Sequence, residues 1–327
     1  MGRVLKTFSE ATLEAMEEEM NRDPSVFVYG EDIVKQGGMW GQFKGLHDKF
    51  GDRVRDTPIS ETALVGAGVG AALAGGRPII DLHYADFIGI TMDEVLNQMA
   101  KAHYMFGGQG TVPLVLRAPD GVFPHGAAQH SQSLETWFVS IPGIKVVVPS
   151  TPENGKGLLK AAIRSNNPVI FFENKKLFGV KGLVSESEVI TPLDKAEVVH
   201  EGKDLTIVSY GYFLGEVLKT VEQAEKEYGI TIEVIDLRSI NPIDEETIID
   251  SVKKTGKLII AHEAIKTGGV GSEVSAIVSE KAFNYIKKPI IRVGAKFSPV
   301  PFSPQLEKGV TTNGGEVLLA IKKLLVE

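Results

Sequence analysis

Residues 145–173 read KVVVPSTPENGKGLLKAAIRSNNPVIFFE, and this stretch decides the fold class. Two runs, Lys145–Ser150 and Pro168–Glu173, are largely apolar, and a stretch of mixed polarity, Glu153–Arg164, separates them. Pro152 stands just before that stretch, and proline is favoured in the first turn of a helix. Continuously apolar strands are typical of a parallel sheet covered on both faces. The stretch therefore predicts a strand, a helix and a second strand of one parallel sheet.

The same alternation continues toward the N-terminus. Thr7 and Glu10 have the spacing of a capping box and predict a helix from there to Met20. The further elements expected on this side are strands at Val26–Glu31, Pro78–Leu82 and Val112–Ala118, and helices at Thr62–Ala74 and Asp93–Met105. Together with residues 145–173, they predict a doubly wound α/β domain at residues 1–185.

Toward the C-terminus the pattern lapses and then restarts. Residues 186–203 mix charged residues with Ser, Thr and Pro, which is typical of an interdomain linker. Beyond them we expect strands at Leu205–Gly211, Thr231–Arg238, Lys257–Glu263 and Pro289–Gly294, and helices ending near Tyr228, starting at Asp244, following Gly271 and covering Glu316–Leu325. They predict a second doubly wound α/β domain at residues 204–327, a usual size for one domain.

The charge and the residue types exclude several classes of function. The 327 residues include 35 Lys and Arg against 42 Asp and Glu, which gives a net charge of −7. Such a chain has no basic surplus with which to neutralise phosphates, so we expect no nucleic acid partner. Cysteine is absent, which rules out disulfides, thiol nucleophiles and thiolate zinc sites.

The N-terminal stretch and the longest apolar run indicate where in the cell the protein is expected. The stretch Met1–Met20 is acidic and has no apolar core, so it predicts neither a signal peptide nor a transit peptide. The longest apolar run, Thr62–Gly76, is shorter than the ~20 residues of a membrane helix. We therefore expect a cytoplasmic protein without a membrane partner.

A glycine-rich run invites comparison with a dinucleotide-binding fingerprint. Gly66, Gly68 and Gly70 have suitable spacing, and Asp86 lies about 20 residues further on. That fingerprint requires a buried strand leading into the first glycine, whereas DTPISETA precedes it here. A helix whose small residues let another backbone approach is the better interpretation, and a nicotinamide-dependent dehydrogenase is the weaker one.

Two ionisable residues are candidates for proton transfer. Glu61 stands just ahead of the Gly and Ala run, where partial desolvation would raise its pKa. From position alone, a helix N-terminal carboxylate that satisfies backbone amides is the more ordinary interpretation. His130, in AAQHSQS, has small and polar neighbours, and an unperturbed histidine titrates near working pH. A hydrogen-bonded loop histidine is the alternative.

Other motifs of known chemistry are missing from the sequence. There is no G-x-S-x-G around Ser131 or Ser133 and no H-E-x-x-H, which disfavours a serine hydrolase and a catalytic zinc site. Neither a P-loop nor a GDG element followed by Asn-Asn occurs, so the chain lacks a diphosphate cradle of its own. Tyr84 and Phe87 follow a predicted strand, where they serve either as core aromatics or as a ligand-binding face.

Eight segments resemble one family over essentially the whole chain. They are VYGEDI, DTPISE, GRPIIDLHYADF, NQMAKAHYMFGG, AAQHSQSLETWF, IPGIKVVVPSTPENGKGLLKAAIRSNNPVIFFENK, VIDLRSINPID and SPVPFS. The family comprises the beta subunits of thiamine-diphosphate-dependent 2-oxo acid dehydrogenases and of the related acetoin dehydrogenases. The resemblance implies a transketolase-type pyrimidine-binding domain followed by a transketolase C-terminal domain. It also implies an α2β2 heterotetramer with thiamine diphosphate between subunits, where the alpha subunit holds Mg²⁺ and the diphosphate.

The resemblance further implies roles for individual residues. Glu61 matches the carboxyl that hydrogen-bonds a nitrogen of the pyrimidine ring, and Phe87 and Ile59 match the apolar groups beside that ring. His130 matches the active-site histidine that donates or steers protons. A structural K⁺ site made of backbone carbonyls is also implied at four matching positions: Leu114, Ala162, Ser165 and Asn167.

The implied reaction passes an acyl group to a lipoyl-bearing acyltransferase. A 2-oxo acid would lose CO₂, whereas acetoin would be cleaved to acetaldehyde, and the C-terminal domain is the expected docking surface for the acyltransferase. DFIG, MFGG and PSTP favour acetoin or pyruvate as substrate, while HEAIKTGG is nearer to the branched-chain 2-oxo acid type. Two alternatives are a self-sufficient transketolase-like enzyme acting on sugar phosphates and a non-catalytic scaffold subunit.

Overall fold

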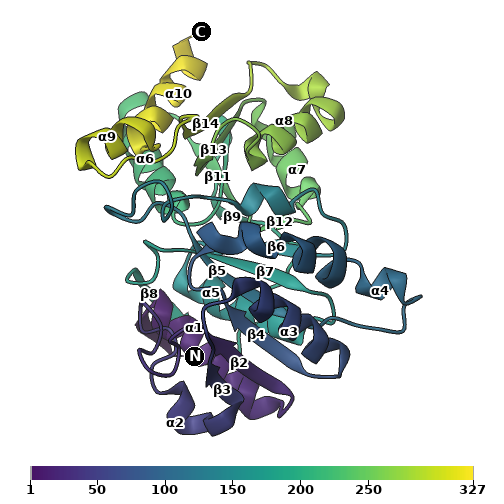
Figure 1. Ribbon diagram of the computed structural model, residues 1–327. Coiled ribbons are helices and arrows are strands. Elements are labelled where there is room, and N and C mark those ends of the chain that lie inside the picture. Colours follow the sequence, from purple (N-terminus) through teal and green to yellow (C-terminus); the bar gives the residue numbers. More distant parts are fainter. Residues whose placement is uncertain (1, 327) are drawn as a thin grey trace.

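The computed structural model describes residues 2–326, which form two α/β parts, each with its own sheet (Figure 1). The first sheet has seven strands in the order β12-β6-β7-β5-β4-β2-β3. Six of them are β2 (Val26–Gly30), β3 (Val54–Asp56), β4 (Arg77–Asp81), β5 (Val115–Asp120), β6 (Lys145–Val147) and β7 (Val169–Asn174). Adjacent members of these six all pair in parallel. The predicted parallel sheet is therefore confirmed.

Helices cover both faces of this sheet. On one face, α1 (Phe8–Arg22) packs beside α5 (Pro152–Arg164), and both share a core with the strands beneath them. On the other face lies α3 (Glu61–Leu73). The capping box predicted at the start of α1 is present, since Glu10 N donates to Thr7 Oγ1 at 3.2 Å and Thr7 N donates to Glu10 Oε2 at 2.7 Å.

Gly68 shows why the glycine-rich run is helical. It lies in the middle of α3, on the side that faces the sheet. A Cβ added there would stand 2.3 Å from Ile80 Cδ1 and 2.7 Å from the Tyr29 hydroxyl. Since α3 begins at Glu61, the glycines stand inside a helix and do not form a turn that follows a strand. The packing interpretation is thus confirmed over the dinucleotide fingerprint.

The second sheet has five strands in the order β14-β13-β10-β11-β9. Its strands are β9 (Glu197–His200), β10 (Leu205–Ser209), β11 (Ile232–Asp236), β13 (Leu258–Ile265) and β14 (Ile291–Ala295). The helices around it are α6 (Phe213–Tyr228), α7 (Glu245–Thr255), α8 (Val270–Lys281), α9 (Pro304–Val310) and α10 (Gly314–Val326). Each strand predicted beyond residue 204 is present, and the four strands from β14 to β11 in this order pair in parallel.

Two strands of the second part depart from the predicted organisation. The segment 186–203, predicted as a linker, contains β9, which pairs antiparallel with β11 at the edge of the second sheet. Strand β12 (Ser239–Asn241) instead joins the first sheet, where it pairs antiparallel with β6. Both strands are short and carry no apolar run, so periodicity could not reveal them. Because β12 crosses between the parts, the two sheets are tied together.

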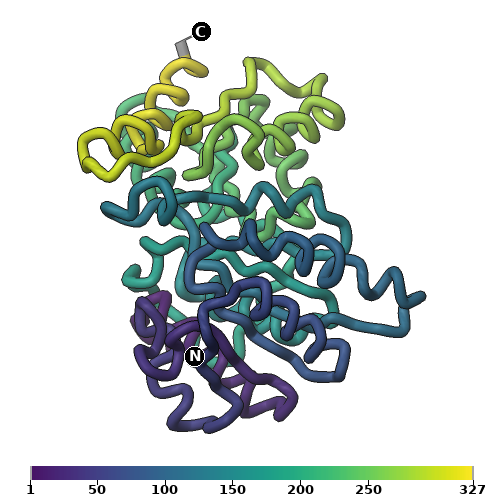
Figure 2. The backbone as a smooth tube through the Cα atoms, viewed as in Figure 1, coloured from purple at the N-terminus to yellow at the C-terminus, as the bar shows by residue number. Residues whose placement is uncertain are grey.

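Several short elements complete the chain. They are β1 (Arg3–Thr7), which pairs with β8 (Lys181–Ser185), helices α2 (Leu46–Phe50) and α4 (Ala102–Met105), a π-helix (Glu94–Met99), and 3₁₀ helices at Gly51–Arg53, Ala85–Thr91, Glu135–Phe138 and Phe283–Tyr285. The stretch predicted to be helical at Asp93–Met105 is helical, but it consists of a π-helix and α4 with a turn between them and is not one regular α-helix. Figure 2 shows α4 and the loop after it projecting from the body. None of the helices between residues 2 and 326 combines the length and apolarity needed to cross a bilayer.

Candidate active site

The candidate residues gather at the edge where the parallel strands of the first sheet end. Glu61 opens α3 just after β3, Phe87 lies in the 3₁₀ helix that follows β4, and His130 lies in the loop after β5. The Thr62 hydroxyl donates to Ile90 O at 3.1 Å, which holds the start of α3 against that 3₁₀ helix. This edge of an open α/β sheet is the usual place for a ligand.

An aromatic cluster surrounds His130. Its ring centroid is 5.0 Å from that of Tyr84 and 5.6 Å from that of Phe87, both in edge-to-face geometry. Tyr84 also contacts His83 at 5.0 Å and Trp40 at 6.0 Å. The structure therefore brings Phe87 and His130, which are far apart in the sequence, into one cluster. Such edge-to-face pairs favour a fixed orientation of the rings.

A buried ion pair holds the loop that carries His130. Lys175 Nζ lies 2.7 Å from Asp86 Oδ2, and both side chains are fully buried. Lys175 also donates to the backbone carbonyls of His130 at 3.0 Å and Gly121 at 3.3 Å. Asp86 Oδ1 accepts from Gln132 N at 2.9 Å. Each charge in this pair has several partners, as a buried ion pair needs if it is to be stable.

Three carboxyl groups lie near the start of α3. Glu61 is half-buried in the first turn of α3, where unpaired N–H groups favour a negative charge. Glu31, at the end of β2, is buried, and its Oε1 has no hydrogen-bond partner within the described chain. Burial, together with the nearby charges of Glu61 and Asp32, raises the pKa of Glu31 to about 6. Burial similarly raises the pKa of Asp81 to about 7.

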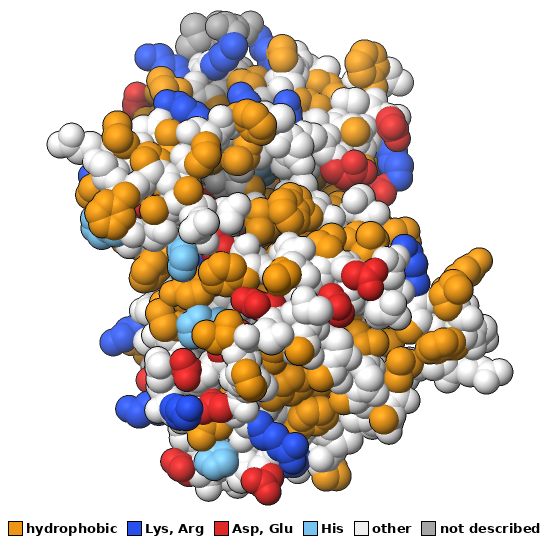
Figure 3. All heavy atoms as spheres, viewed as in Figure 1, with side chains coloured by type: hydrophobic (Ala, Val, Ile, Leu, Met, Phe, Trp, Pro, Cys, Tyr) orange, Lys and Arg blue, Asp and Glu red, His pale blue; other side chains and the backbone are white. Residues whose placement is uncertain are grey.

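The apolar residues of the site are open to the outside. Ile59, in the segment before α3, is 77% exposed, and Phe87 is 37% exposed. A single exposed apolar residue is ordinary, but Ile59 and Phe87 stand at the same strand-end edge as Glu61 and His130. Figure 3 shows hydrophobic side chains gathered across the middle of this face of the molecule.

The predicted carbonyl cluster lies at the opposite edge of the sheet. Leu114 O accepts from Val169 N at 2.9 Å, and Ala162 O accepts from Ser165 N at 3.1 Å. Asn167 O accepts from the Ser165 hydroxyl at 3.0 Å, while Arg77 Nη1 donates to Ser165 O at 3.0 Å. Since each of the four carbonyls already has a donor, a K⁺ ion would have to use their second lone pairs.

Side chains suited to a divalent metal do not converge in the described part of the chain. Between residues 2 and 326 there is no group of three or more His, Asp or Glu side chains that could hold an ion.

The loop after β5 also contacts the second part of the molecule. Tyr210 donates to Glu135 Oε1 at 2.9 Å, and Val122 N donates to Glu263 Oε2 at 3.4 Å. Burial raises the pKa of Glu135 to about 7 and that of the neighbouring Asp120 well above its usual range. These contacts fix the loop between the two sheets.

Sequence reasoning singled out Glu61, Phe87 and His130 but missed Glu31 and the role of Lys175. Both missed residues stand where an apolar strand ends, in VFVYGE and VIFFENK. A charged residue at that place in a buried strand was a usable signal, because charges are buried only when they are paired or functional.

Two family models match this chain, one in each part of the molecule. "Transketolase, pyrimidine binding domain" matches residues 6–181, and "Transketolase, C-terminal domain" matches residues 194–315. A solved structure with a similar fold is "Split gene transketolase, inactive beta4 tetramer", with a TM-score of 0.82, 24% identity and 97% of both chains covered. That likeness supports the fold.

Several curated proteins are similar over nearly their whole length. The chain is 44% identical over 322 residues to the acetoin:2,6-dichlorophenolindophenol oxidoreductase subunit beta of Cupriavidus necator, covering 95% of each. It is 42% identical over 313 residues to the 2-oxoisovalerate dehydrogenase subunit beta of Bacillus subtilis, again covering 95% of each. It is also 42% identical to the pyruvate dehydrogenase E1 component subunit beta of Gracilaria tenuistipitata, covering 97% of this chain and 98% of that protein.

Proposed function

Because this chain belongs to the transketolase-type beta subunits of 2-oxo acid and acetoin dehydrogenases, we propose that its strand-end edge forms one wall of a thiamine diphosphate site. One observation carries this proposal: Glu61 stands beside the 3₁₀ helix that bears Phe87, and Phe87 contacts His130. A carboxyl, an exposed aromatic face and a histidine are the groups that an aminopyrimidine site needs.

The residues of this wall have distinct roles in the proposal. The Glu61 carboxyl binds a ring nitrogen of the aminopyrimidine, and Phe87 and Ile59 pack on the ring and exclude water. His130 holds or delivers a proton at its imidazole, whose orientation the rings of Tyr84 and Phe87 fix. When bound, thiamine diphosphate supplies the electron sink that cleavage beside a carbonyl requires.

A second chain completes the site in this proposal. The wall is open at Ile59 and Phe87, the sequence has no diphosphate-binding motif, and no three His, Asp or Glu side chains of the described residues converge where an ion could bind. We therefore assign the diphosphate and Mg²⁺ to an alpha subunit in an α2β2 heterotetramer. The second α/β part would dock the lipoyl-bearing acyltransferase. The cytoplasmic location expected from the acidic N-terminal stretch stays a prediction.

The substrate class is the next question that the proposal raises. The chain is 42–44% identical to beta subunits named for acetoin, 2-oxoisovalerate and pyruvate. These values are too close to one another to indicate which of the three substrates this chain uses. We propose acetoin or pyruvate first and a branched-chain 2-oxo acid second. Initial rates of the reconstituted heterotetramer with each substrate and a dye acceptor would decide between them.

The Glu61→Gln variant tests the proposed site. We expect turnover of the heterotetramer to fall at least about 100-fold, because glutamine cannot relay a proton as a carboxyl does. Glu245→Gln, in the first turn of α7, is the matched control and should keep full activity. Assembly is checked by size-exclusion chromatography, so that a loss of turnover is not mistaken for a loss of the complex.

Other outcomes of the same assays would favour the alternative functions. Unchanged turnover in a Glu61→Gln/His130→Ala double variant would indicate a scaffold subunit. Tight binding of thiamine diphosphate by the isolated chain, together with activity on sugar phosphates, would indicate a transketolase-like enzyme. Either result would overturn the proposal.

We also propose that K⁺ binds the carbonyls of Leu114, Ala162, Ser165 and Asn167 through their second lone pairs. Arg77 donates to Ser165 O and Ile163 O at 3.0 Å, so K⁺ would share this cluster with a guanidinium group. Preferential K⁺ binding to the folded chain should raise its melting temperature by about 2–4 °C in KCl relative to tetramethylammonium chloride at equal ionic strength. Equal melting temperatures would contradict the site.

A further inference from the structure

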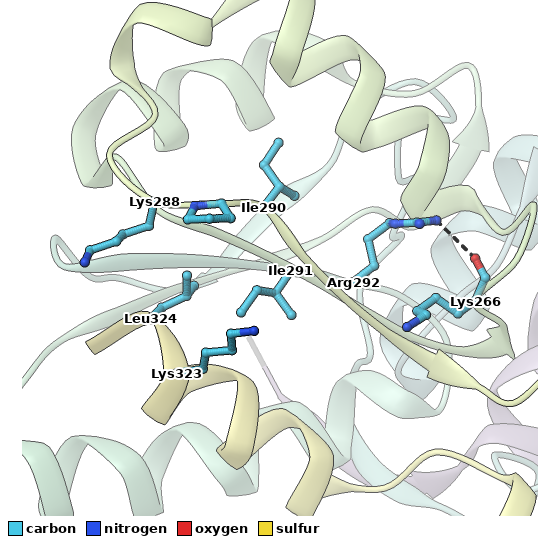
Figure 4. Close-up of a pocket in the computed structure, with 8 residues that line it drawn as sticks. Lys266, Lys288, Ile290, Ile291, Arg292, Lys323 and Leu324 are labelled. Carbon is cyan, nitrogen blue, oxygen red and sulfur yellow. Dashed lines mark hydrogen bonds between the residues drawn. The ribbon is translucent and has the colours of Figure 1, made fainter. Parts of the chain in front are cut away.

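A groove runs along the outer edge of the second sheet, between β14 and α10 (Figure 4). Its volume is about 500 Å³. It is lined by residues 288–292, by Lys266 just after β13, and by Lys323 and Leu324 of α10. In Figure 4, Ile291 and Lys323 point toward one another across this space. Neither Glu61 nor His130 lines this groove.

Basic side chains surround the groove, although the protein as a whole has a net charge of −7. Lys266, Lys288 and Arg292 form no ion pair with any residue between 2 and 326. Arg292 donates only to neutral groups, Lys266 O at 3.2 Å and the Ser272 hydroxyl at 2.5 Å. Three cations without carboxylate partners in an acidic protein favour an anionic ligand.

The backbone at this place is also open to a partner. Strand β14 pairs with β13 on one side and, within the described chain, has no strand on its other side. An open edge offers unpaired N–H and C=O groups to which an extended peptide can add as a further strand. A second hollow of similar volume continues along the same strand to Phe297, so the open edge lies along one extended groove.

Lysines on an edge strand often serve only to prevent aggregation. That role does not call for a hollow beside the strand. Here the lysines border a groove that contains the partly exposed Ile291, with the exposed Leu319 and Phe297 further along. A free phosphate would gain nothing from these apolar side chains or from an open strand edge. A peptide with alternating acidic and apolar side chains would use all three features.

We propose that this groove binds an extended, acidic and apolar peptide segment of a partner protein, which adds as a strand to β14. Its apolar side chains would contact Ile291, Leu319 and Phe297, and its carboxylates would pair with Lys266, Lys288 and Arg292. The site goes beyond the proposed catalytic role and does not depend on it.

The test uses the full chain and a fluorescein-labelled peptide of alternating Glu and Val, with a Gln and Val peptide for comparison. By fluorescence anisotropy, the acidic peptide should bind at least about tenfold more tightly than the neutral one at low salt, and this preference should shrink as salt screens the charges. Lys266→Glu/Lys288→Glu should weaken acidic-peptide binding at least about tenfold. The matched variant Lys35→Glu/Lys226→Glu, which changes the net charge equally at two exposed lysines elsewhere, should not.

Three results would overturn the proposal. They are equal affinity for the two peptides, equal weakening by both double variants, and displacement of the peptide by inorganic phosphate at matched ionic strength. Hydrogen exchange provides the independent check, since peptide binding should slow exchange in residues 289–295, and protection elsewhere would place the binding site elsewhere. The groove variants should retain dye-linked turnover with the alpha subunit, so a failure of this proposal is distinguishable from a failure of the catalytic one.

Discussion

Two buried polar regions lie side by side at the candidate active site and are built in opposite ways. In the first, Lys175 and Asp86 form an ion pair at 2.7 Å, and backbone groups satisfy their remaining atoms. In the second, Glu31 and Asp81 are buried, and each has an oxygen without a hydrogen-bond partner in the described chain. The first region has matched charges, whereas the second has carboxyl groups whose pKa values burial raises.

The comparison suggests that the ion pair keeps a loop in place, whereas the two buried carboxyl groups gain and lose protons. A fully paired buried ion pair keeps one protonation state and one geometry, which suits a group that fixes the loop of His130. Carboxyl groups with pKa values of about 6 and 7 exchange protons near neutral pH, which suits a site where protons move. Variants of each region should therefore respond differently to mutation and to pH.

The largest expected effect comes from Lys175→Met. The change leaves the Asp86 carboxylate buried without its charge partner, so the free energy of unfolding should fall by about 3–5 kcal/mol. Urea denaturation measures it, and turnover of the heterotetramer should fall as well, because the carbonyl of His130 loses its donor.

The neighbouring Lys176 provides a control, since it pairs with Glu263 but is partly exposed. Lys176→Met should lower the free energy of unfolding by about 1 kcal/mol or less. If Lys175→Met does not fold, Lys175→Met/Asp86→Leu removes both charges and should recover stability but not turnover. A Lys175→Met variant as stable as Lys176→Met would mean that the pair does not fix the loop.

Asp81→Asn should give the next largest effect, and it depends on pH. The pKa of Asp81 is raised in the folded protein, so the folded state binds its proton more tightly than the unfolded state does. The bound proton of Asp81 therefore contributes to the free energy of unfolding below about pH 4, and this contribution is lost as the pH rises to about 7. Relative to the variant, the wild type should lose a few kcal/mol of unfolding free energy across that window.

Glu31→Gln should change the pH dependence of the unfolding free energy in the same direction as Asp81→Asn, but by a smaller amount. The pKa of Glu31 rises only to about 6, so the wild type should lose about 1–2 kcal/mol relative to the variant between about pH 4.5 and 6. Denaturation of both proteins at pH 4.5 and pH 8 measures the difference. A wild type that gains stability over the variant as the pH rises would reverse the sign and show that the Glu31 carboxylate is stabilised by a partner.

Local sequence determined most of the fold. Apolar runs such as Val26–Glu31 and Pro168–Glu173 predict buried parallel strands because their side chains favour burial on both faces of a sheet. This preference does not depend on which strand is the neighbour. The capping box of Thr7 and Glu10 is likewise a local interaction. The neighbours of Glu61 and His130 marked them only as candidates for proton transfer, and the resemblance of DTPISE and AAQHSQS to one family supplied their expected roles.

Tertiary structure alone decided the rest. Strands β9 and β12 form because they pair with β11 and β6 at the edges of the two sheets. Their own residues have no apolar pattern that predicts a strand. Lys175 gains its role from Asp86 and His130, and the pKa of Glu31 depends on burial and on Glu61, all brought together by pairing of distant strands. The hydrophobic pattern of a segment shows which of its residues are buried. Charge pairing and desolvation depend instead on which distant segments pack against one another.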